Sequence, residues 1–196
     1  YWNRYLLFGS GASNPPKTWD YMGALAPKLS VHSGNGTITR SAAALGGWNN
    51  NENAKAILSA LFFQVGTPIV GLSSQGTPAA LLDVSSGDVL ATADSALRFY
   101  TDFGNPAKTT YSWNRALPEA RRLFVGSSLV FYFGFASELP TIKAQNPNLN
   151  FDVAEFPQIK GATSPVTFGN LTAFAIPNTA ENQARSAGLL SVASLL

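Results

Sequence analysis

Aromatic residues stand beside neutral polar side chains at three places in this 196-residue sequence. The densest case is LGGWNNNENAK at 45–55, where one tryptophan precedes four asparagines; the others are YSWN at 111–114 and FYFGFAS at 131–137. Flat rings suit the C–H faces of a sugar, and amides and hydroxyls suit its hydroxyl groups. Each cluster is equally compatible with a loop whose aromatic residue is fixed in the core.

Nucleophilic, metal-dependent and phosphate-binding chemistry find little support. His32 is the one histidine, cysteine is absent and no G-x-S-x-G pattern occurs, so His32 is interpreted as a solvated surface residue. The 11 acidic residues, Glu138 among them, are scattered and are interpreted as solvated or salt-bridged. The GSGAS segment at 9–13 lacks the G-K-[ST] ending of a phosphate loop.

The composition favours one sizeable folded unit with few charges. Hydrophobic residues make up 45% of the chain and charged residues only 12%, with a net charge of +2. Arg121 and Arg122 are the one adjacent basic pair, which argues against nucleic-acid binding. The apolar runs are too short to span a bilayer, and no signal peptide is visible. Because the sequence starts with Tyr1 rather than Met, we expect a piece of a longer protein.

The elements that must position these residues alternate between helix and strand, which predicts a layered α/β fold. The first eight residues are expected to form a short strand or a helix entry. The predicted helices cover 16–30 (capped by Thr18 and shortened or kinked by Pro27), 51–65, 92–103, 117–125, 135–145 and 179–196. The predicted strands cover 37–45, a hairpin in 68–83 turning near Gly76, 127–133, 149–157 and 166–176.

The order of these segments resembles a known family. YWNRYLLF followed by NPPKTWDYMGALAPKLS, then ALRFYTDFGNPAKTTYSWN, then RLFVGSSLVFYFGFASELPTIKAQNPNLNFDVAEFPQ, is similar to sugar-type extracellular solute-binding proteins of ABC transporters, the class of maltose-binding protein. One departure is that Gly126 is followed by SSLV where the family commonly has K-A-A-M. The family's aromatic residue after that strand falls at Phe135 or Ala136.

The resemblance implies one lobe of a two-lobed periplasmic binding protein fold of type II, with a mixed sheet flanked by helices. Residues 1–168 would form the second lobe. Residues 169–196 would contain the return crossing, with a strand and helix belonging to a first lobe that is otherwise absent.

The resemblance also implies which residues face the interlobe cleft. The candidates are Trp48, Asn49, Asn50, Asn51, Glu52, Asn53, Trp113, Phe135, Ala136, Ser137 and Asn170. Trp48 would either stack on sugar or anchor its turn, and the anchor is favoured. Replacing Asn50 and Asn51 by alanine is expected to weaken sugar binding without changing the melting temperature.

The implied function is non-catalytic capture of a carbohydrate for an ATP-driven importer, without cofactor or metal. The expected partners are the sugar, a membrane permease and the missing first lobe, with no nucleic acid. The expected location is periplasmic or extracellular, with a lipid anchor as an option for the full-length protein. The alternatives are a glycoside-hydrolase-like enzyme with two facing carboxylates, and a cell-envelope interaction module with an apolar surface patch and no polar pocket.

Overall fold

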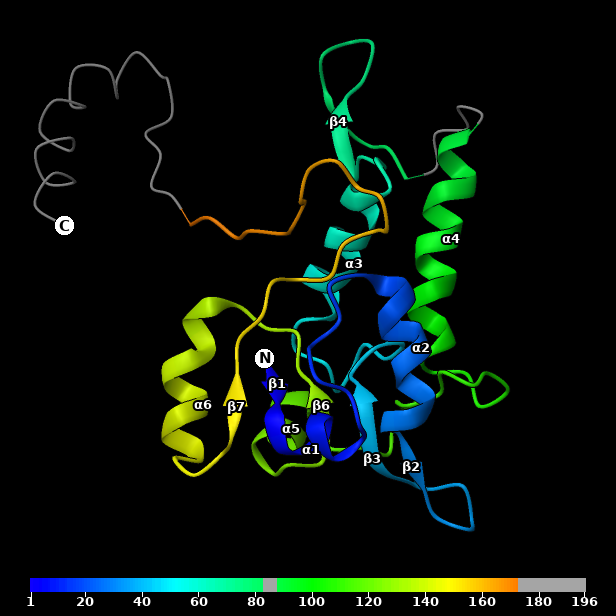
Figure 1. The fold of residues 1–196 in the computed structure, drawn as a ribbon. Coiled ribbons are helices and arrows are strands. Elements are labelled where there is room, and N and C mark those ends of the chain that lie inside the picture. The colour runs from blue at the N-terminus through cyan, green and yellow to red at the C-terminus, as the bar shows by residue number, and fades with distance from the viewer. Residues whose placement is uncertain (83–87, 173–196) are drawn as a thin grey trace, which may run out of the picture.

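A five-stranded mixed sheet organises the described part of this computed structural model, residues 1–82 and 88–172 (Figure 1). Its strand order is β2-β3-β6-β1-β7. The strands are β1 (Trp2–Asn3), β2 (Val31–His32), β3 (Ile38–Ala43), β6 (Leu129–Phe131) and β7 (Phe151–Asp152). β3 and β6 run parallel, whereas β1 is antiparallel to both β6 and β7. The predicted mixed α/β architecture is confirmed.

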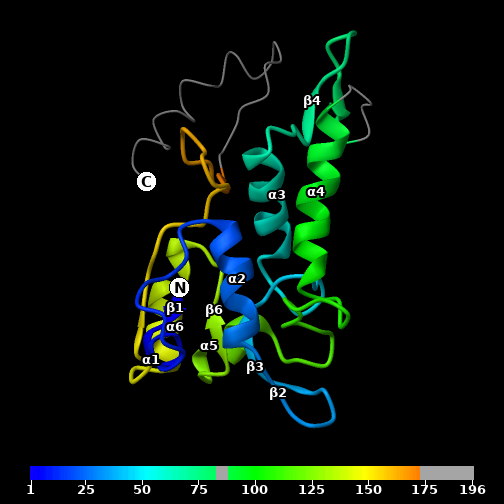
Figure 2. The same ribbon diagram turned by 45° about the vertical axis from the view of Figure 1, so that its right-hand side comes forward.

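Helices cover both faces of the sheet. They are α1 (Arg4–Gly9), α2 (Trp19–Leu29), α3 (Ala54–Gln64), α4 (Asp88–Asp102), α5 (Ala120–Val125), the 3-10 turn η1 (Ala136–Glu138) and α6 (Leu139–Gln145). α2, α3 and α4 lie together on one side of the sheet, and α5 and α6 lie on the other (Figure 2). A small hairpin, β4 (Val70–Leu72) with β5 (Pro78–Ala80), extends beyond the end of α3.

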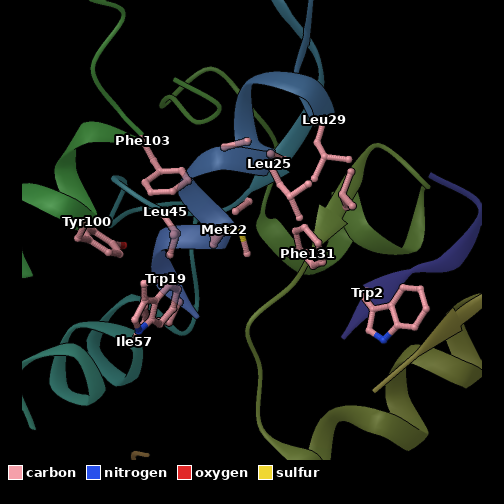
Figure 3. Close-up of a cluster of buried hydrophobic side chains, with 14 of the residues drawn as sticks. Trp2, Trp19, Met22, Leu25, Leu29, Leu45, Ile57, Tyr100, Phe103 and Phe131 are labelled. Atoms are coloured by element: carbon pink, nitrogen blue, oxygen red, sulfur yellow. The ribbon is translucent and has the colours of Figure 1, made fainter. Parts of the chain in front are cut away.

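Two clusters of buried apolar side chains lie between the sheet and the helices on its two faces. The larger cluster packs α2, α3 and α4 against the sheet through residues such as Trp19, Met22, Ile57 and Phe103 (Figure 3). The smaller cluster lies on the α5 and α6 side and includes Trp113. β6 is buried along its whole length because it lies between the two clusters, as its continuous apolar sequence predicts.

Helix α2 continues past Pro27, although the sequence predicts that this proline shortens or kinks it. Thr18 caps α2 as predicted, because its hydroxyl accepts a hydrogen bond from the Tyr21 amide at 3.4 Å. Pro27 lies near the end of the helix, which nevertheless continues to Leu29. The buried side chains of Leu25 and Leu29 pack on the larger cluster and hold this last turn in place.

Several predicted helix starts are shifted, and the predicted helix 135–145 begins with the 3-10 turn η1 before α6 starts at Leu139. α3 begins at Ala54 and α5 at Ala120, each three residues later than predicted, whereas α4 begins at Asp88 rather than residue 92. The preceding residues of α3 and α5 make tertiary contacts instead of helical ones. For example, the carbonyl of Leu117, before α5, accepts from Asn50 Nδ2 at 2.8 Å. Local sequence patterns do not register such long-range bonds.

The hairpin around Gly76 is confirmed, but two other strand predictions fail in part. Only residues 151–152 of the predicted strand 149–157 pair with a neighbour. Residues 166–172 form no strand, because the backbone of Val166 bonds to the side chains of Gln64 and Gln158 instead of to another strand. The predicted helix 179–196 and the end of the predicted strand 166–176 lie outside the described residues.

Candidate functional site

Two loops meet where the parallel strands β3 and β6 end. β3 leads into the amide turn, residues 46–53, and β6 leads into the aromatic loop, residues 132–138. Because β3 and β6 are parallel neighbours, their carboxyl ends lie at the same edge of the sheet. Ligand sites of open α/β folds commonly lie at such an edge. This edge is therefore the candidate site.

Hydrogen bonds join the two loops directly. The side-chain amide of Asn53 donates to the Tyr132 hydroxyl at 3.0 Å and to Glu138 Oε1 at 2.9 Å. The Tyr132 hydroxyl in turn donates to Glu138 Oε2 at 2.5 Å. Burial, followed by the hydrogen bond to Glu138, raises the pKa of Tyr132 far above its ordinary value. Tyr132 is therefore a neutral donor in this network.

Two adjoining pockets open beside the aromatic loop. The larger has a volume of about 230 Å³ and the smaller about 50 Å³, and both are walled by Phe133, Gly134, Phe156 and Thr167. Of the predicted site residues, Asn53 and Phe135 line the smaller pocket and Ala136 lines the larger. Asn53 lies more than 80 positions before Phe135 and Ala136 in the sequence, so the fold brings the two predicted segments together.

Three other predicted residues are tied up in the protein interior. Asn50 Nδ2 donates to the carbonyls of Asn114 and Leu117, and its Oδ1 accepts from Trp113 Nε1 at 2.9 Å. Asn51 is 3% exposed and donates to the carbonyl of Ala44 at 2.5 Å. Trp113 is 0% exposed. In this arrangement Asn51 and Trp113 are buried, and the half-buried Asn50 uses its side-chain amide to support the turn.

Trp48 is placed differently from our expectation. It is 59% exposed, so it does not anchor the amide turn, and Trp113 takes that role from a segment far along the chain. Sequence favoured the wrong tryptophan because it could not show that Trp113 reaches Asn50. The neighbouring Asn49 and Glu52 are also exposed. These three side chains remain available at the surface of the turn.

The last two predicted residues, Ser137 and Asn170, are exposed and line neither pocket. The chain just before Asn170 does reach the site, because the Phe168 ring lies 6.3 Å from that of Phe135 and 6.4 Å from that of Phe63. Segment 165–168 therefore lies against the aromatic loop and the side of α3.

Sequence reasoning missed the residues that assemble the site. Glu138 was grouped with acids expected to be solvated or salt-bridged, and it does form an ion pair with Arg121, with a 3.6 Å N–O distance. Its position three residues after Phe135 was an available signal, since an acid there can bond to the backbone at a helix start. The Phe135 amide indeed donates to Glu138 Oε1 at 2.9 Å. Tyr132 gave no comparable local signal.

Residues 1–82 and 88–172 contain neither a cluster of metal-ligating side chains nor a helix suited to span a membrane. Within those ranges, histidine and acidic residues form no group of three that could hold a metal ion. His32 is exposed, as predicted, and its ring is stacked on Tyr111 with centroids 5.6 Å apart. Within the same ranges, every helix falls short of the length and hydropathy that a membrane span requires.

Comparison with known proteins shows the family of this chain. Residues 1–194 match the family model described as bacterial extracellular solute-binding protein. The chain belongs to this family. The chain shares its fold with an ABC transporter solute-binding protein from Thermotoga lettingae TMO, solved with α-D-tagatose (TM-score 0.59, 19% identity). It also shares its fold with CpMnBP1, solved with mannotriose (TM-score 0.57, 22% identity). A comparison with curated proteins finds no match.

The chain spans less than half the length of these two relatives. The first alignment covers 94% of this chain and 45% of the relative, and the second covers 83% and 40%. At these identities the comparison shows the shared fold, that of type II periplasmic binding proteins. The family resemblance and the predicted fold class are both confirmed.

Proposed function

We propose that this chain is one lobe of the carbohydrate-capturing component of an ATP-driven importer. The observation that carries the proposal is the meeting of the amide turn and the aromatic loop at the carboxyl edge of β3 and β6. At this edge Asn53 and Phe135 line one pocket, and Trp48 is exposed on the amide turn. Such a surface suits a neutral, polyhydroxylated ligand. The sugars in the two related structures support the same class.

The proposed mechanism is closure of two lobes around the sugar. Residues 1–168 would be the second lobe and 169–196 the return crossing to the first. The partial coverage of both relatives supports this division. Ligand contacts shared by two lobes stabilise a closed state, which a permease can distinguish from the open one. The family's extracellular character supports a periplasmic or extracellular location, and we include lipid anchoring of the full-length protein in the proposal.

The contacts of the acidic residues support a binding role rather than a catalytic one. A glycosidase needs two carboxylates free to act on one bond. Glu138 is engaged by Arg121, Tyr132, Asn53 and the Phe135 amide. Glu155 is the acidic residue that lines the larger pocket. We therefore propose that the protein has no enzymatic activity.

An envelope interaction module has one observation in its favour. Val70 and Leu72 on the β4–β5 hairpin are 65% and 71% exposed, which gives an apolar surface outside the candidate site. That alternative also predicts the absence of a polar pocket. The pocket lined by Asn53 and Thr167 favours ligand capture instead.

Calorimetry on the full-length protein tests the proposal. We expect D-tagatose, mannotriose or another carbohydrate of a mono- and oligosaccharide panel to bind, and a tripeptide not to bind. Trp48→Ala should weaken sugar binding about tenfold, or 1.4 kcal/mol, because its exposed ring would cover the ligand. Tyr5→Ala removes a comparably exposed ring on α1 and should leave affinity unchanged. Binding of the peptide alone, or of no carbohydrate, would refute carbohydrate capture.

A further inference from the structure

The carboxylate of Glu138 is the point at which the two loops of the candidate site and α5 meet. Its Oε1 accepts from Asn53 Nδ2 and from the Phe135 amide, both at 2.9 Å. Its Oε2 accepts from the Tyr132 hydroxyl at 2.5 Å and lies 3.6 Å from Arg121 Nη1. The side chain is only 15% exposed. Each oxygen therefore has one partner within the aromatic loop and one on another segment.

These four contacts fix the relative positions of the two loops and α5, because each partner restrains a different group. A mostly buried carboxylate is tolerated only when it is paired and hydrogen-bonded, and Arg121 supplies the compensating charge. The bonds from Tyr132 and the Phe135 amide set the curvature of the aromatic loop. The bond from Asn53 ties that loop to the first residues of α3. Loss of the carboxylate would remove a partner from all four groups at once, and Asn53 and Tyr132 would keep only the 3.0 Å bond between them.

The aromatic loop is also packed tightly around this carboxylate. A Cβ atom at Gly134 would lie 2.7 Å from Glu138 Oε1 and 2.7 Å from the Tyr132 ring. The chain therefore passes Gly134 closely enough that only glycine fits without a shift of these groups. Phe133 and Gly134 wall both pockets, so the path of the chain here sets their shape.

We propose that Glu138 is a positioning residue of the ligand site, which ties the amide turn to the aromatic loop so that Asn53 and Phe135 line one pocket. Glu138 acts through its neighbours and does not touch the ligand. The tie between the loops stands on the contacts above, and its consequence for sugar affinity rests on the function proposed for this edge.

Hydrogen–deuterium exchange on the ligand-free, full-length protein tests the tie. In Glu138→Ala, backbone amides in 48–56 and in 132–138 should exchange at least tenfold faster than in the wild type. Exchange in the β2–β3 hairpin should not change. Glu119→Gln is the matched control, because Glu119 is an exposed acid on the segment that leads into α5. Faster exchange confined to 132–138 would overturn the proposal, since the amide turn would then not depend on Glu138.

Affinity for D-tagatose and mannotriose, measured separately, tests the consequence. Glu138→Ala should weaken binding about 100-fold and Glu138→Gln about tenfold, because glutamine keeps one acceptor. Combining Asn53→Ala with Glu138→Ala should cost less than the sum of the two single changes, because both remove the bond between Asn53 and Glu138. Affinity within twofold of the wild type, together with faster exchange, would make Glu138 purely structural and overturn the proposal. If neither sugar binds the wild type, the proposed function fails for these sugars, and the exchange result alone decides whether the tie exists.

Discussion

Asn50 connects the amide turn to the segment that precedes α5 through side-chain hydrogen bonds. Its amide nitrogen donates to the carbonyls of Asn114 at 2.9 Å and Leu117 at 2.8 Å, while its oxygen accepts from the buried Trp113 indole. The half-buried side chain thus provides a partner for three groups. A buried polar group left without a partner costs about 1–3 kcal/mol. At this residue, the effect of a substitution falls on stability.

Asn50→Ala is therefore expected to lower the free energy of unfolding by about 2 kcal/mol. Denaturant titration of the full-length protein measures this, and Asn49→Ala is the control because Asn49 is exposed in the same turn. This expectation reverses the one drawn from sequence, in which the melting temperature stayed constant and sugar affinity fell. An unchanged denaturation midpoint with weaker sugar binding would restore the earlier interpretation.

At the scale of elements, the amide turn and the end of α4 approach at a pair of glycines. Gly46 has a φ of +84°, and a Cβ atom on it would lie 2.3 Å from the Gly104 backbone nitrogen. The left-handed backbone and the close approach both exclude a side chain. The turn that follows β3 and the loop that follows α4 can therefore touch only through glycine.

Gly46→Ala should destabilise the protein by about 3 kcal/mol or more, since backbone strain adds to a backbone clash. Gly23→Ala is the matched control, and it should change the free energy of unfolding in the opposite direction. Gly23 lies inside α2 with nothing within 4 Å of an added Cβ, so alanine should stabilise by about 0.5–1 kcal/mol. Denaturant titration distinguishes the two, and equal effects would contradict this account of Gly46.

Gln64, at the end of α3, fastens the segment that leads away from the site. Its oxygen accepts from Trp19 Nε1 at 2.7 Å, and its nitrogen donates to the carbonyls of Pro157 and Val166, both at 2.9 Å. One side chain thus connects α2, α3 and two points of the segment 157–166. This segment contributes Pro157 to the wall of the larger pocket.

Gln64→Leu should release this segment, because leucine keeps the bulk but removes all three bonds. Hydrogen exchange in 158–168 is expected to accelerate about tenfold or more, and unfolding should become easier by about 1–3 kcal/mol. Gln145→Leu is the control, since Gln145 is exposed at the end of α6. Unaltered exchange in 158–168 would show that other contacts hold the segment.

Across the whole molecule, the response to alkaline pH depends on buried tyrosines. Burial raises the pKa of Tyr100 from 10 to about 12, and its hydroxyl donates to the carbonyl of Gly47 at 2.5 Å. Burial and Glu138 raise the pKa of Tyr132 as well. The unfolded chain loses these protons first, so their contribution to stability is complete below pH 10. The contribution of Tyr100 is lost as the pH rises through about 12.

The free energy of unfolding should therefore fall steeply between about pH 10 and 12, by about 1.4 kcal/mol per pH unit for each such tyrosine. Tyr100→Phe should be less stable at pH 8 but lose less stability over this range. Denaturant titrations at stepped pH measure both effects, with Tyr5→Phe as an exposed control. A slope identical to that of the wild type would exclude Tyr100 as a cause.

The sequence determined the layered α/β class, the buried strand β6, the Thr18 cap and the hairpin at Gly76, because these depend on patterns within a few residues. It also determined the family, since segment order survives in the chain itself. The tertiary structure decided which aromatic residue is exposed and which asparagine is free. Trp48 and Trp113 share the same local chemistry, but Trp113 is buried in the smaller apolar cluster and bonds to Asn50 across 63 positions, whereas Trp48 is exposed. The tie between Asn53 and Glu138 has the same cause, since long-range hydrogen bonds leave no periodic trace in sequence.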